Sequence, residues 1–269
     1  MRPAADAPPP WRVLTPDWPS PAGVRAVCTL RSGGVSQSPY GQLNLGTHVG
    51  DDPVAVEANR QRLAQAIQAR PVFLQQVHGQ GVVALHPDTP DGTEADACWT
   101  QTPELACTIL VADCLPVLMT DVRGTVVAAA HAGWRGLAQG VLQRTLHAVC
   151  EAAQTPPRDV MVWLGPCIGP KAFEVGLDVC RAFGADAKDA SADAACQTSP
   201  HFRAGQAPDK WFADLPALAR QALQQAGVTQ LYGNDSSDAW CTVTQSGRFF
   251  SYRRDGRTGR FAACIWRTR

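Results

Sequence analysis

The sequence has no net charge, no long apolar run and no paired-cysteine motif. Its 269 residues include 24 Lys and Arg and 24 Asp and Glu. This balance leaves no electrostatic footprint for nucleic acid or an anionic membrane surface, so we expect neither as a partner. No apolar run approaches the roughly 18 residues that a membrane-spanning helix needs. The first ten residues lack the apolar centre of a signal peptide, and we expect a cytoplasmic protein.

None of the ten cysteines has the Cys-x-x-Cys spacing, which excludes a zinc knuckle and a thioredoxin-type redox motif. Most cysteines lie in apolar runs, as in residues 26–30 (AVCTL), where a buried thiol packs as a small hydrophobic group. The simplest expectation is a reducing compartment in which the thiols are free.

The chain has neither an internal repeat nor a clear linker, which favours a single domain over residues 23–269. A proline-rich, weakly patterned segment at residues 1–22 predicts a flexible N-terminal arm. Strands and helices alternate only in part along the chain. The prediction is therefore an α/β fold with mixed β-sheets rather than a purely parallel sheet.

Apolar runs and helical periodicity predict the individual elements. Asp52 and Pro53 are a typical helix start, an acidic cap followed by proline at the first helical position. Residues 185–207 have little pattern and predict a loop. We expect helices at 53–67, 137–153, from 177 onward and at 214–226, and strands at 24–30, 71–77, 81–85, 105–111, 116–121, 126–130, 160–164, 249–252 and 261–266.

Three polar side chains stand where apolar runs begin or end. His131 follows the run 126–130 and precedes a Gly-Trp-Arg-Gly turn into a helix. His78 and Cys114 lie beside two other expected strands. Sites in α/β proteins form outside the carboxyl ends of strands, so we expect these three side chains to share one site.

This trio fits two different chemistries. Two imidazoles and one thiolate suit zinc, with copper as the alternative, and three protein ligands leave one coordination position open for catalysis. Cys114 with His131 as its base would instead make a thiolate–imidazolium nucleophile. Asp113 would orient that pair only if the chain turns there, since neighbouring residues on a strand face opposite sides.

Candidate anion contacts are arginines near glycine. Arg31 opens a glycine-rich loop that is either a plain turn or an anion cradle. Arg135 either binds phosphate or pairs with an acid, and Trp134 either stacks on a ligand or packs in the core. The basic loop 253–260 is either a solvated face or an anion site.

Ten short motifs together resemble the laccase-domain family, also described as polyphenol oxidases and as purine nucleoside phosphorylases, which includes the bacterial peptidoglycan editing factor. The resemblance spans Val24 to Trp266 in order. The most specific motifs are HAGWRG and ADCLP. The motifs are 31–36 (RSGGVS), 43–46 (LNLG), 50–52 (GDD), 76–79 (QVHG), 112–116 (ADCLP), 131–136 (HAGWRG), 165–169 (GPCIG), 173–175 (FEV), 241–242 (CT) and 251–254 (SYRR).

The resemblance implies an α/β/β/α layered single domain with His78, Cys114 and His131 as both the metal ligands and the catalytic residues. Val111 stands where the family usually has threonine. The implied activity is zinc-dependent phosphorolysis of purine nucleosides (adenosine, inosine, guanosine and methylthioadenosine), with adenosine deamination as well.

The expected partners are a purine nucleoside and phosphate, with Arg31, Asn44 or Arg135 holding the substrate. The oligomeric state stays open, and the sequence is compatible with a monomer. Two alternatives remain. One is a cysteine hydrolase or amidase that edits a peptidoglycan precursor. The other is a copper-dependent polyphenol oxidase, which the six histidines disfavour because multicopper sites need more ligands.

Overall fold

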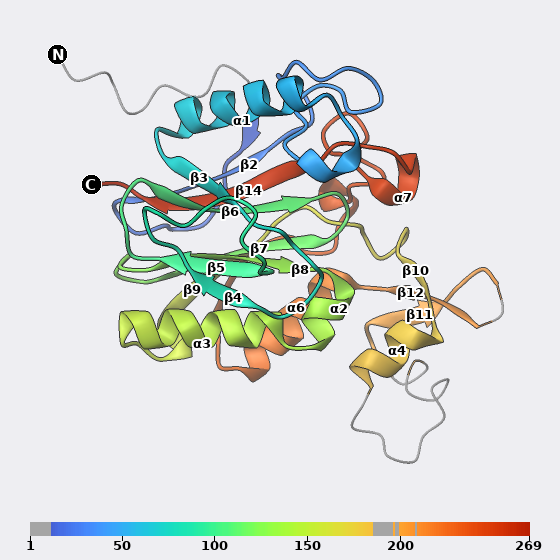
Figure 1. Cartoon of the computed structure of the whole chain (residues 1–269). Helices are drawn as coiled ribbons and strands as arrows, with labels where there is room; N and C mark the ends of the chain where they lie inside the picture. The colour runs from blue at the N-terminus through green and yellow to red at the C-terminus, as the bar shows by residue number, and fades with distance from the viewer. Residues whose placement is uncertain (1–11, 185–195, 197–198, 208) are drawn as a thin grey trace.

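Two β-sheets stacked face to face form the centre of the molecule, as the computed structural model shows for residues 12–184, 196, 199–207 and 209–269 (Figure 1). The first sheet has the strand order β1 (Val13–Leu14), β2 (Val24–Thr29), β14 (Phe261–Arg267), β6 (Leu105–Val111) and β3 (Arg70–Phe73). The second has the order β13 (Gln230–Gly233), β9 (Val160–Leu164), β7 (Leu115–Asp121), β8 (Val127–Ala132), β5 (Ala97–Thr100) and β4 (Val82–Ala84).

Both sheets combine parallel and antiparallel pairs. In the first, β3 pairs in parallel with β6, and β14 runs antiparallel to β6. In the second, β4 and β5 are parallel, whereas β7 and β8 are antiparallel. The prediction of mixed sheets is confirmed.

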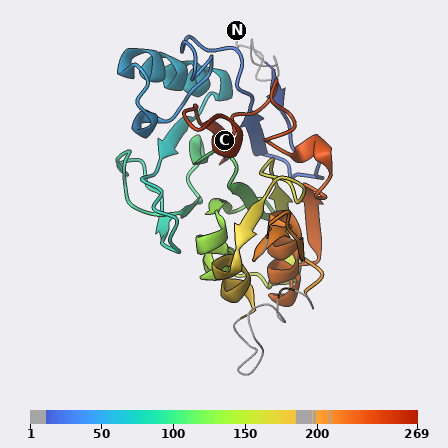
Figure 2. The ribbon, with the colours of Figure 1, turned by 90° about the vertical axis from the view of Figure 1, so that its right-hand side faces the viewer.

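Helices cover the outer face of each sheet. Helix α1 (Pro53–Ile67) lies on the first sheet, and α3 (Val141–Ala153) and α6 (Leu215–Gln225) lie on the second (Figure 1). Figure 2 shows from another side that α1 and α6 lie at opposite ends of the stack. The layers therefore follow the predicted α/β/β/α order. No helix in the described part of the chain is long and apolar enough to cross a membrane.

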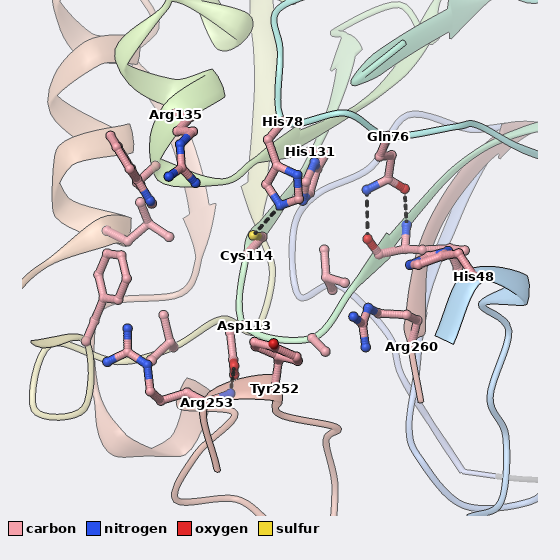
Figure 3. A pocket seen from close by; sticks show the side chains of 17 residues that line it. His48, Gln76, His78, Asp113, Cys114, His131, Arg135, Tyr252, Arg253 and Arg260 are labelled. Carbon is pink, nitrogen blue, oxygen red and sulfur yellow. Dashed lines mark hydrogen bonds between the residues drawn. The ribbon is translucent and has the colours of Figure 1, made fainter. Parts of the chain in front are cut away.

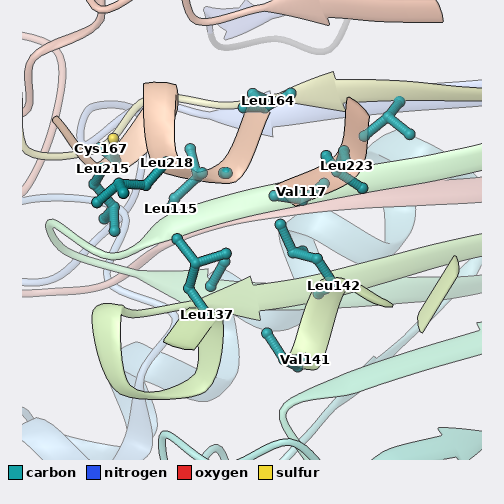
Figure 4. Close-up of a cluster of buried hydrophobic side chains, with 14 of the residues drawn as sticks. Leu115, Val117, Leu137, Val141, Leu142, Leu164, Cys167, Leu215, Leu218 and Leu223 are labelled. Atoms are coloured by element: carbon teal, nitrogen blue, oxygen red, sulfur yellow. The ribbon is translucent and has the colours of Figure 1, made fainter. Parts of the chain in front are cut away.

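Separate apolar clusters join these layers. Between the two sheets, Ile109 and Phe261 of the first pack with Leu118 and Trp163 of the second. A second cluster fills the space between the second sheet and its helices. Figure 4 shows its members Leu115, Val117, Leu137, Val141, Leu142, Leu164, Cys167, Leu215, Leu218 and Leu223.

Helix α1 forms where the sequence predicts it. The Asp52 side chain caps the helix by accepting a hydrogen bond from the Val54 N–H at 3.0 Å, and Pro53 occupies the first turn. Leu63 and Ile67 are buried against the first sheet.

Several segments differ from the prediction, including strands β5 and β13, which were not expected. The helix expected over 137–153 is two helices, α2 (Trp134–Ala138) and α3, because Gly140 between them has the left-handed φ of 90°. Residues 249–252 are not a strand: Phe249 and Phe250 are buried in irregular chain, and α7 (Tyr252–Asp255) follows. Within the expected arm, β1 pairs with β2 and Trp18 is only 8% exposed, so this part is bound to the core. Residues 1–11 lie outside the described residues.

A small third sheet lies beside the main stack. It consists of β10 (Glu174–Gly176), β12 (Lys210–Ala213) and β11 (Phe202–Ala204), next to α4 (Leu177–Phe183). Strand β11 lies inside the segment expected to be a loop, most of which falls outside the described residues. Cys180 of α4 forms a disulfide with Cys196, which contradicts the expectation that all thiols are free.

Candidate metal centre and its pocket

The structure brings His78, Cys114 and His131 together from three separate places in the chain. His131 lies in β8, Cys114 directly precedes β7, and His78 lies in the loop between β3 and β4. Their ligand atoms lie within 4.8 Å of one another, and Cys114 Sγ is 3.8 Å from His78 Nε2. Figure 3 shows the three side chains directed toward one point. They are the only such group of metal-ligand side chains within the described ranges.

Asp96 holds two of these three residues in place. Its side chain is fully buried and accepts a hydrogen bond from His131 Nδ1 at 2.8 Å. The same carboxylate accepts the backbone N–H groups of Val77, His78 and Gly79 at 3.2, 2.9 and 2.7 Å. Because Nδ1 is engaged, Nε2 of His131 is the nitrogen that faces the site.

The carboxylate of Asp96 also explains the backbone of His78. His78 has a φ of 61°, which is uncommon for a residue other than glycine. Consecutive N–H groups around such a residue point into one concavity that binds an anion. Asp96 fills this concavity, and Gln76 anchors the loop further by two hydrogen bonds of 2.8 Å with the backbone of Leu110.

Asp113 sets the direction of Cys114 without contacting the thiol. Asp113 has a φ of 97°, so the chain turns between β6 and β7. Its carboxylate accepts the Thr242 hydroxyl at 2.6 Å and the Arg253 N–H at 2.7 Å. Asp113 therefore fixes the turn, and Asp96 is the carboxylate that orients the imidazole.

Gly133 leaves the space that the ligands need. A Cβ at this position would lie 3.0 Å from Cys114 Sγ and 3.1 Å from His78 Cδ2. Both distances are tighter than most packing contacts, so a larger residue would push the two side chains aside by a few tenths of an ångström.

The charges in the metal-free site favour a thiolate. Burial raises the pKa of Cys114, but the positive charge of His131 and hydrogen bonds from both histidines outweigh it and lower this pKa to about 6. Burial lowers the pKa of His131, but the Cys114 thiolate and the hydrogen bond to Asp96 raise it to about 9. Near neutral pH the pair is a thiolate beside an imidazolium.

This donor set fits a metal ion. Zinc prefers imidazole nitrogen and thiolate sulfur, and copper accepts the same ligands. The buried carboxylate on His131 is the usual support of a metal-ligating histidine. Three protein ligands leave a position open toward the neighbouring pocket.

A pocket of about 520 Å³ adjoins the three residues. Its lining includes apolar and aromatic side chains, among them Leu110, Trp134 and Phe173, and the arginines Arg135, Arg253 and Arg260. This volume is within the usual range for small-molecule sites, about 300–1,000 Å³. In Figure 3, Arg135 and Arg253 lie on one side of Cys114 and Arg260 lies on the other.

Of the three residues expected to hold substrate, Arg135 lines this pocket, and Arg31 and Asn44 are not among its lining residues. Arg31 donates to the backbone oxygen of Ser246 at 2.8 Å and stacks over Phe250. Asn44 is fully buried and bonds to Gly46, Asp51 and the backbone of Arg260. The structure thus places Arg31 and Asn44 in the framework around the site.

Sequence reasoning missed several residues that the structure places here. Asp96 had one visible signal, a charged residue between two alanines immediately before an apolar strand. His48 and Tyr252 line the pocket but come from a three-residue 3-10 helix and a four-residue α-helix, which are too short for periodicity to carry information. From the basic loop, Arg253 and Arg260 reach the pocket.

Layered mixed sheets and a cluster of two histidines and one cysteine define an α/β protein with a candidate metal site. The chain belongs to the family described as multi-copper polyphenol oxidoreductase laccase, which it matches over residues 25–268. This match confirms the resemblance drawn from the motifs.

Relatives with names and solved structures match over nearly the whole chain. The chain is 49% identical to purine nucleoside phosphorylase PA4543 of Pseudomonas aeruginosa, over 94% of this chain and 97% of that protein. It is 47% identical to purine nucleoside phosphorylase YfiH of Escherichia coli, over 95% and 98%. The crystal structure of Neisseria meningitidis protein NMB0706 is similar with a TM-score of 0.86 and 46% identity, covering 96% of this chain and 100% of that one. YlmD from Geobacillus stearothermophilus has a TM-score of 0.84 and 30% identity, covering 97% of each chain.

Proposed function

We propose that this protein is a zinc-dependent purine nucleoside phosphorylase that cleaves adenosine, inosine, guanosine and methylthioadenosine. The observation that supports this proposal most directly is the His78–Cys114–His131 cluster, which lies beside a pocket lined by aromatic side chains and three arginines. The names of the relatives support the same activity. The natural metal is zinc in this proposal, with copper as the alternative for the same ligands.

Phosphorolysis needs phosphate and nucleoside to be held together. An oxygen of phosphate forms a bond to C1′ of the ribose while the bond from C1′ to the base breaks. The bonding electrons leave with the base, which takes up a proton, and the products are the purine and ribose 1-phosphate. Positive charge develops on the sugar, so the protein must place the phosphate dianion close to C1′.

The lining residues divide naturally between these two tasks. The pocket arginines, Arg135, Arg253 and Arg260, are the candidates to bind phosphate, since a guanidinium matches phosphate oxygens in pairs. Tyr252, which is 62% exposed, and Trp134 offer aromatic faces on which a purine can stack. A metal held by His78, Cys114 and His131 would supply a Lewis acid. Asp96 keeps His131 oriented for that ligand set.

Adenosine deamination is a second activity that we propose for this pocket. In that reaction water replaces the amino group at C6 of the purine and yields inosine and ammonia. The reaction needs an activated water beside the ring, which a site with one open metal position can supply. The ligands proposed for phosphorolysis therefore serve both reactions.

The contacts of Cys114 also favour a second class of function, a cysteine hydrolase or amidase such as one that edits a peptidoglycan precursor. Cys114, His131 and Asp96 follow the order of nucleophile, base and orienting carboxylate. In this case the thiolate itself attacks a carbonyl carbon, and the amine leaves with a proton from His131. Metal would inhibit such an enzyme by occupying the thiolate.

A copper-dependent polyphenol oxidase is the third reading, and we do not favour it. Four-electron reduction of dioxygen uses several copper ions with many histidine ligands, whereas the described residues contain one three-ligand group. We also propose that the protein works in the cytoplasm, and its oligomeric state stays open. Its eight free cysteines suit a reducing compartment, whereas the Cys180–Cys196 disulfide is more typical of an oxidising one.

The test combines metal analysis with two assays. We expect about one zinc per chain, release of purine from adenosine and inosine only in the presence of phosphate, and inosine from adenosine without phosphate. Cys114→Ala should remove the metal and lower phosphorolysis by at least ~100-fold, because a ligand is lost. Cys150→Ala, at the half-buried cysteine of α3, is the matched control and should keep both.

Two results would reject the proposal. The first is a Cys114→Ala protein that keeps full zinc content and full phosphorolysis. The second is wild-type protein that releases no base in phosphate. A metal-free protein that hydrolyses amides and is blocked by a thiol reagent would establish the hydrolase instead.

A further inference from the structure

A second cavity continues from the catalytic pocket on the side of Arg260. Its volume is about 370 Å³, and it shares His48, Tyr252 and Arg260 with the pocket described above. Val49, Gly256, Arg257 and Thr258 complete its lining. We call this space the annex. A molecule that occupies the catalytic pocket can therefore extend into the annex past Tyr252.

The annex carries positive charge that the protein does not neutralise. Arg257 donates through Nε to the Tyr40 hydroxyl and through Nη2 to the Gly50 oxygen at 3.0 Å. Arg260 donates through Nη1 to the backbone oxygens of Thr258 and Gly259, each at 3.1 Å. All these acceptors are neutral, and no ion pair found in the described part of the chain involves either arginine.

Among the neighbouring titratable groups, Cys114 and Asp113 act on Arg260 from the catalytic pocket, but neither lines the annex. None of the residues that line the annex is acidic. Asp255 of the same loop is bound by Arg254 at 2.7 and 2.6 Å, and this hydrogen bond lowers its pKa. Burial and the charges of Arg260 and Arg60 lower the pKa of His48, so this imidazole is neutral near pH 7 and free to donate one hydrogen bond.

Thr258 adds a polar group without a well-formed hydrogen bond. Its residue is 1% exposed, and its Oγ1 makes no hydrogen bond of normal geometry among the described residues, although it lies close enough to Asp255 to help lower the pKa of that carboxyl. A buried hydroxyl in this state is unfavourable, whereas a ligand oxygen in the annex would satisfy it. The annex therefore presents two guanidinium groups, one hydroxyl and one imidazole to its occupant.

We propose that the annex binds a phosphoryl group, an inference that rests on the nucleoside phosphorylase function proposed above. Two arginines with free N–H groups and a hydroxyl donor match the oxygens of a phosphate dianion. Two molecules can bring this group. One is the inorganic phosphate that attacks the nucleoside, and the other is a nucleoside 5′-phosphate whose base lies in the catalytic pocket.

The sharpest test removes only the hydroxyl of Thr258. Thr258→Val keeps the shape of the side chain and, having lost a hydroxyl without a well-formed hydrogen bond, should not lower thermal stability. Calorimetric titration measures the affinity for inorganic phosphate and for adenosine 5′-monophosphate. For at least one of these two ligands, the variant should bind about tenfold more weakly than the wild type. Thr125→Val is the matched control, since Thr125 Oγ1 is likewise buried and unpartnered but lies outside both cavities. It should bind both ligands like the wild type.

A charge variant then identifies the source of the phosphoryl group. Arg257→Gln should weaken the same ligand as Thr258→Val and leave the affinity for adenosine unchanged. Loss for inorganic phosphate alone assigns the annex to the attacking phosphate; loss for the monophosphate alone assigns it to a nucleotide substrate. The proposal is overturned if Thr258→Val binds both anions like the wild type, or if both variants weaken adenosine equally.

The binding measurement keeps this proposal separate from the enzymatic one. If the protein releases no base from any nucleoside but Thr258→Val still weakens phosphate binding, the phosphorylase function fails and the annex stands as a phosphoryl site. If phosphorolysis proceeds and neither variant changes anion binding, the function stands and the annex proposal fails.

Discussion

Asp96 makes the geometry of the site possible from a buried position. It accepts one hydrogen bond from His131 Nδ1 and three from the backbone around His78. Burial raises the pKa of Asp96, but the hydrogen bonds with His131 and the Gly79 N–H outweigh it and hold the pKa below its usual value. The carboxylate thus stays ionised and couples two ligands that are 53 positions apart in the sequence.

Asp96→Asn should weaken zinc binding by roughly 10–100-fold, the range seen when supports of metal ligands are changed. The amide nitrogen of asparagine cannot accept the N–H groups of the His78 loop, so at least one ligand loses its position. Competition with a chromogenic chelator measures the affinity. The control is Asp88→Asn, the same chemical change at an exposed position in the loop between β4 and β5, and its zinc affinity should match that of the wild type. Equal affinity of both variants would show that Asp96 does not position the ligands.

Sequence reasoning predicted the three proposed ligands but not their support or their surroundings. Each ligand stood next to a glycine or at the end of an apolar run, and such places are visible in a sequence. His48 and Tyr252 carry no such signal, and Asp96 shows only its charge before an apolar strand, because the roles of all three depend on contacts between distant segments. Arg31 and Asn44 stood in glycine-rich motifs, yet their side chains bind the backbone of the framework.

At the scale of elements, the short helix α2 is placed by two glycines. Gly133 lies against Cys114 and His78, and a Cβ on Gly136 would lie 2.6 Å from the Gly79 oxygen. The first turn of α2 therefore packs directly on the ligand loops, and it presents Trp134 and Arg135 to the pocket.

We expect Gly133→Ala to lower zinc affinity by ~10-fold or more. The added methyl group would push Cys114 and His78 away from their positions, and displaced ligands bind a metal ion less well. Metal content after dialysis against a weak chelator is the measurement. The control is Gly247→Ala, where a Cβ would have no neighbour within 4 Å. If Gly133→Ala retained zinc as well as the control does, the close contact would have no bearing on metal binding.

Elements with long periodic patterns were predictable, and so were most short apolar runs, such as those that form β6, β7 and β9. The failures have local causes. The cap at Asp52 and the apolar spacing up to Ile67 define α1 in the sequence. By contrast, the pattern after His131 is continuous across Gly140, whose left-handed conformation is a backbone property that periodicity does not reveal. Phe249 and Phe250 are apolar and buried, and burial alone does not distinguish a strand from irregular chain.

At the scale of the whole molecule, stacking two sheets brings remote strand ends to one point. Strand β7 lies between β8 and β9 in the second sheet, so Cys114 at its start adjoins His131 of β8. Mixed sheets followed from the uneven alternation of elements in the sequence. The strand orders did not, because β14 from the C-terminal end pairs between β2 and β6, and such long-range pairing leaves no local pattern.

The thiolate–imidazolium pair predicts how pH affects folding and metal binding differently. The pKa of Cys114 is lower in the folded protein, about 6, than in the unfolded chain, about 9. It therefore stabilises the fold fully above pH 9, and this stability is lost as the pH falls toward 6. A raised pKa of His131 adds stability below about 6.5 that is lost as pH rises toward 9. Between these limits the folded pair holds one proton, and so does the unfolded thiol with its neutral imidazole. The pair therefore leaves folding stability nearly independent of pH in this window.

Zinc binding should depend strongly on pH in the same window, because the metal replaces the proton on His131. The affinity should rise about tenfold for each pH unit between about 6.5 and 9 and level off above 9, since 2.303RT per unit corresponds to one released proton. Calorimetry at pH 8 in two buffers of different ionisation enthalpy counts that proton directly. Release near zero at pH 8, with an affinity that does not change up to pH 9, would mean that His131 is already neutral in the metal-free protein and that Asp96 does not stabilise its charged form.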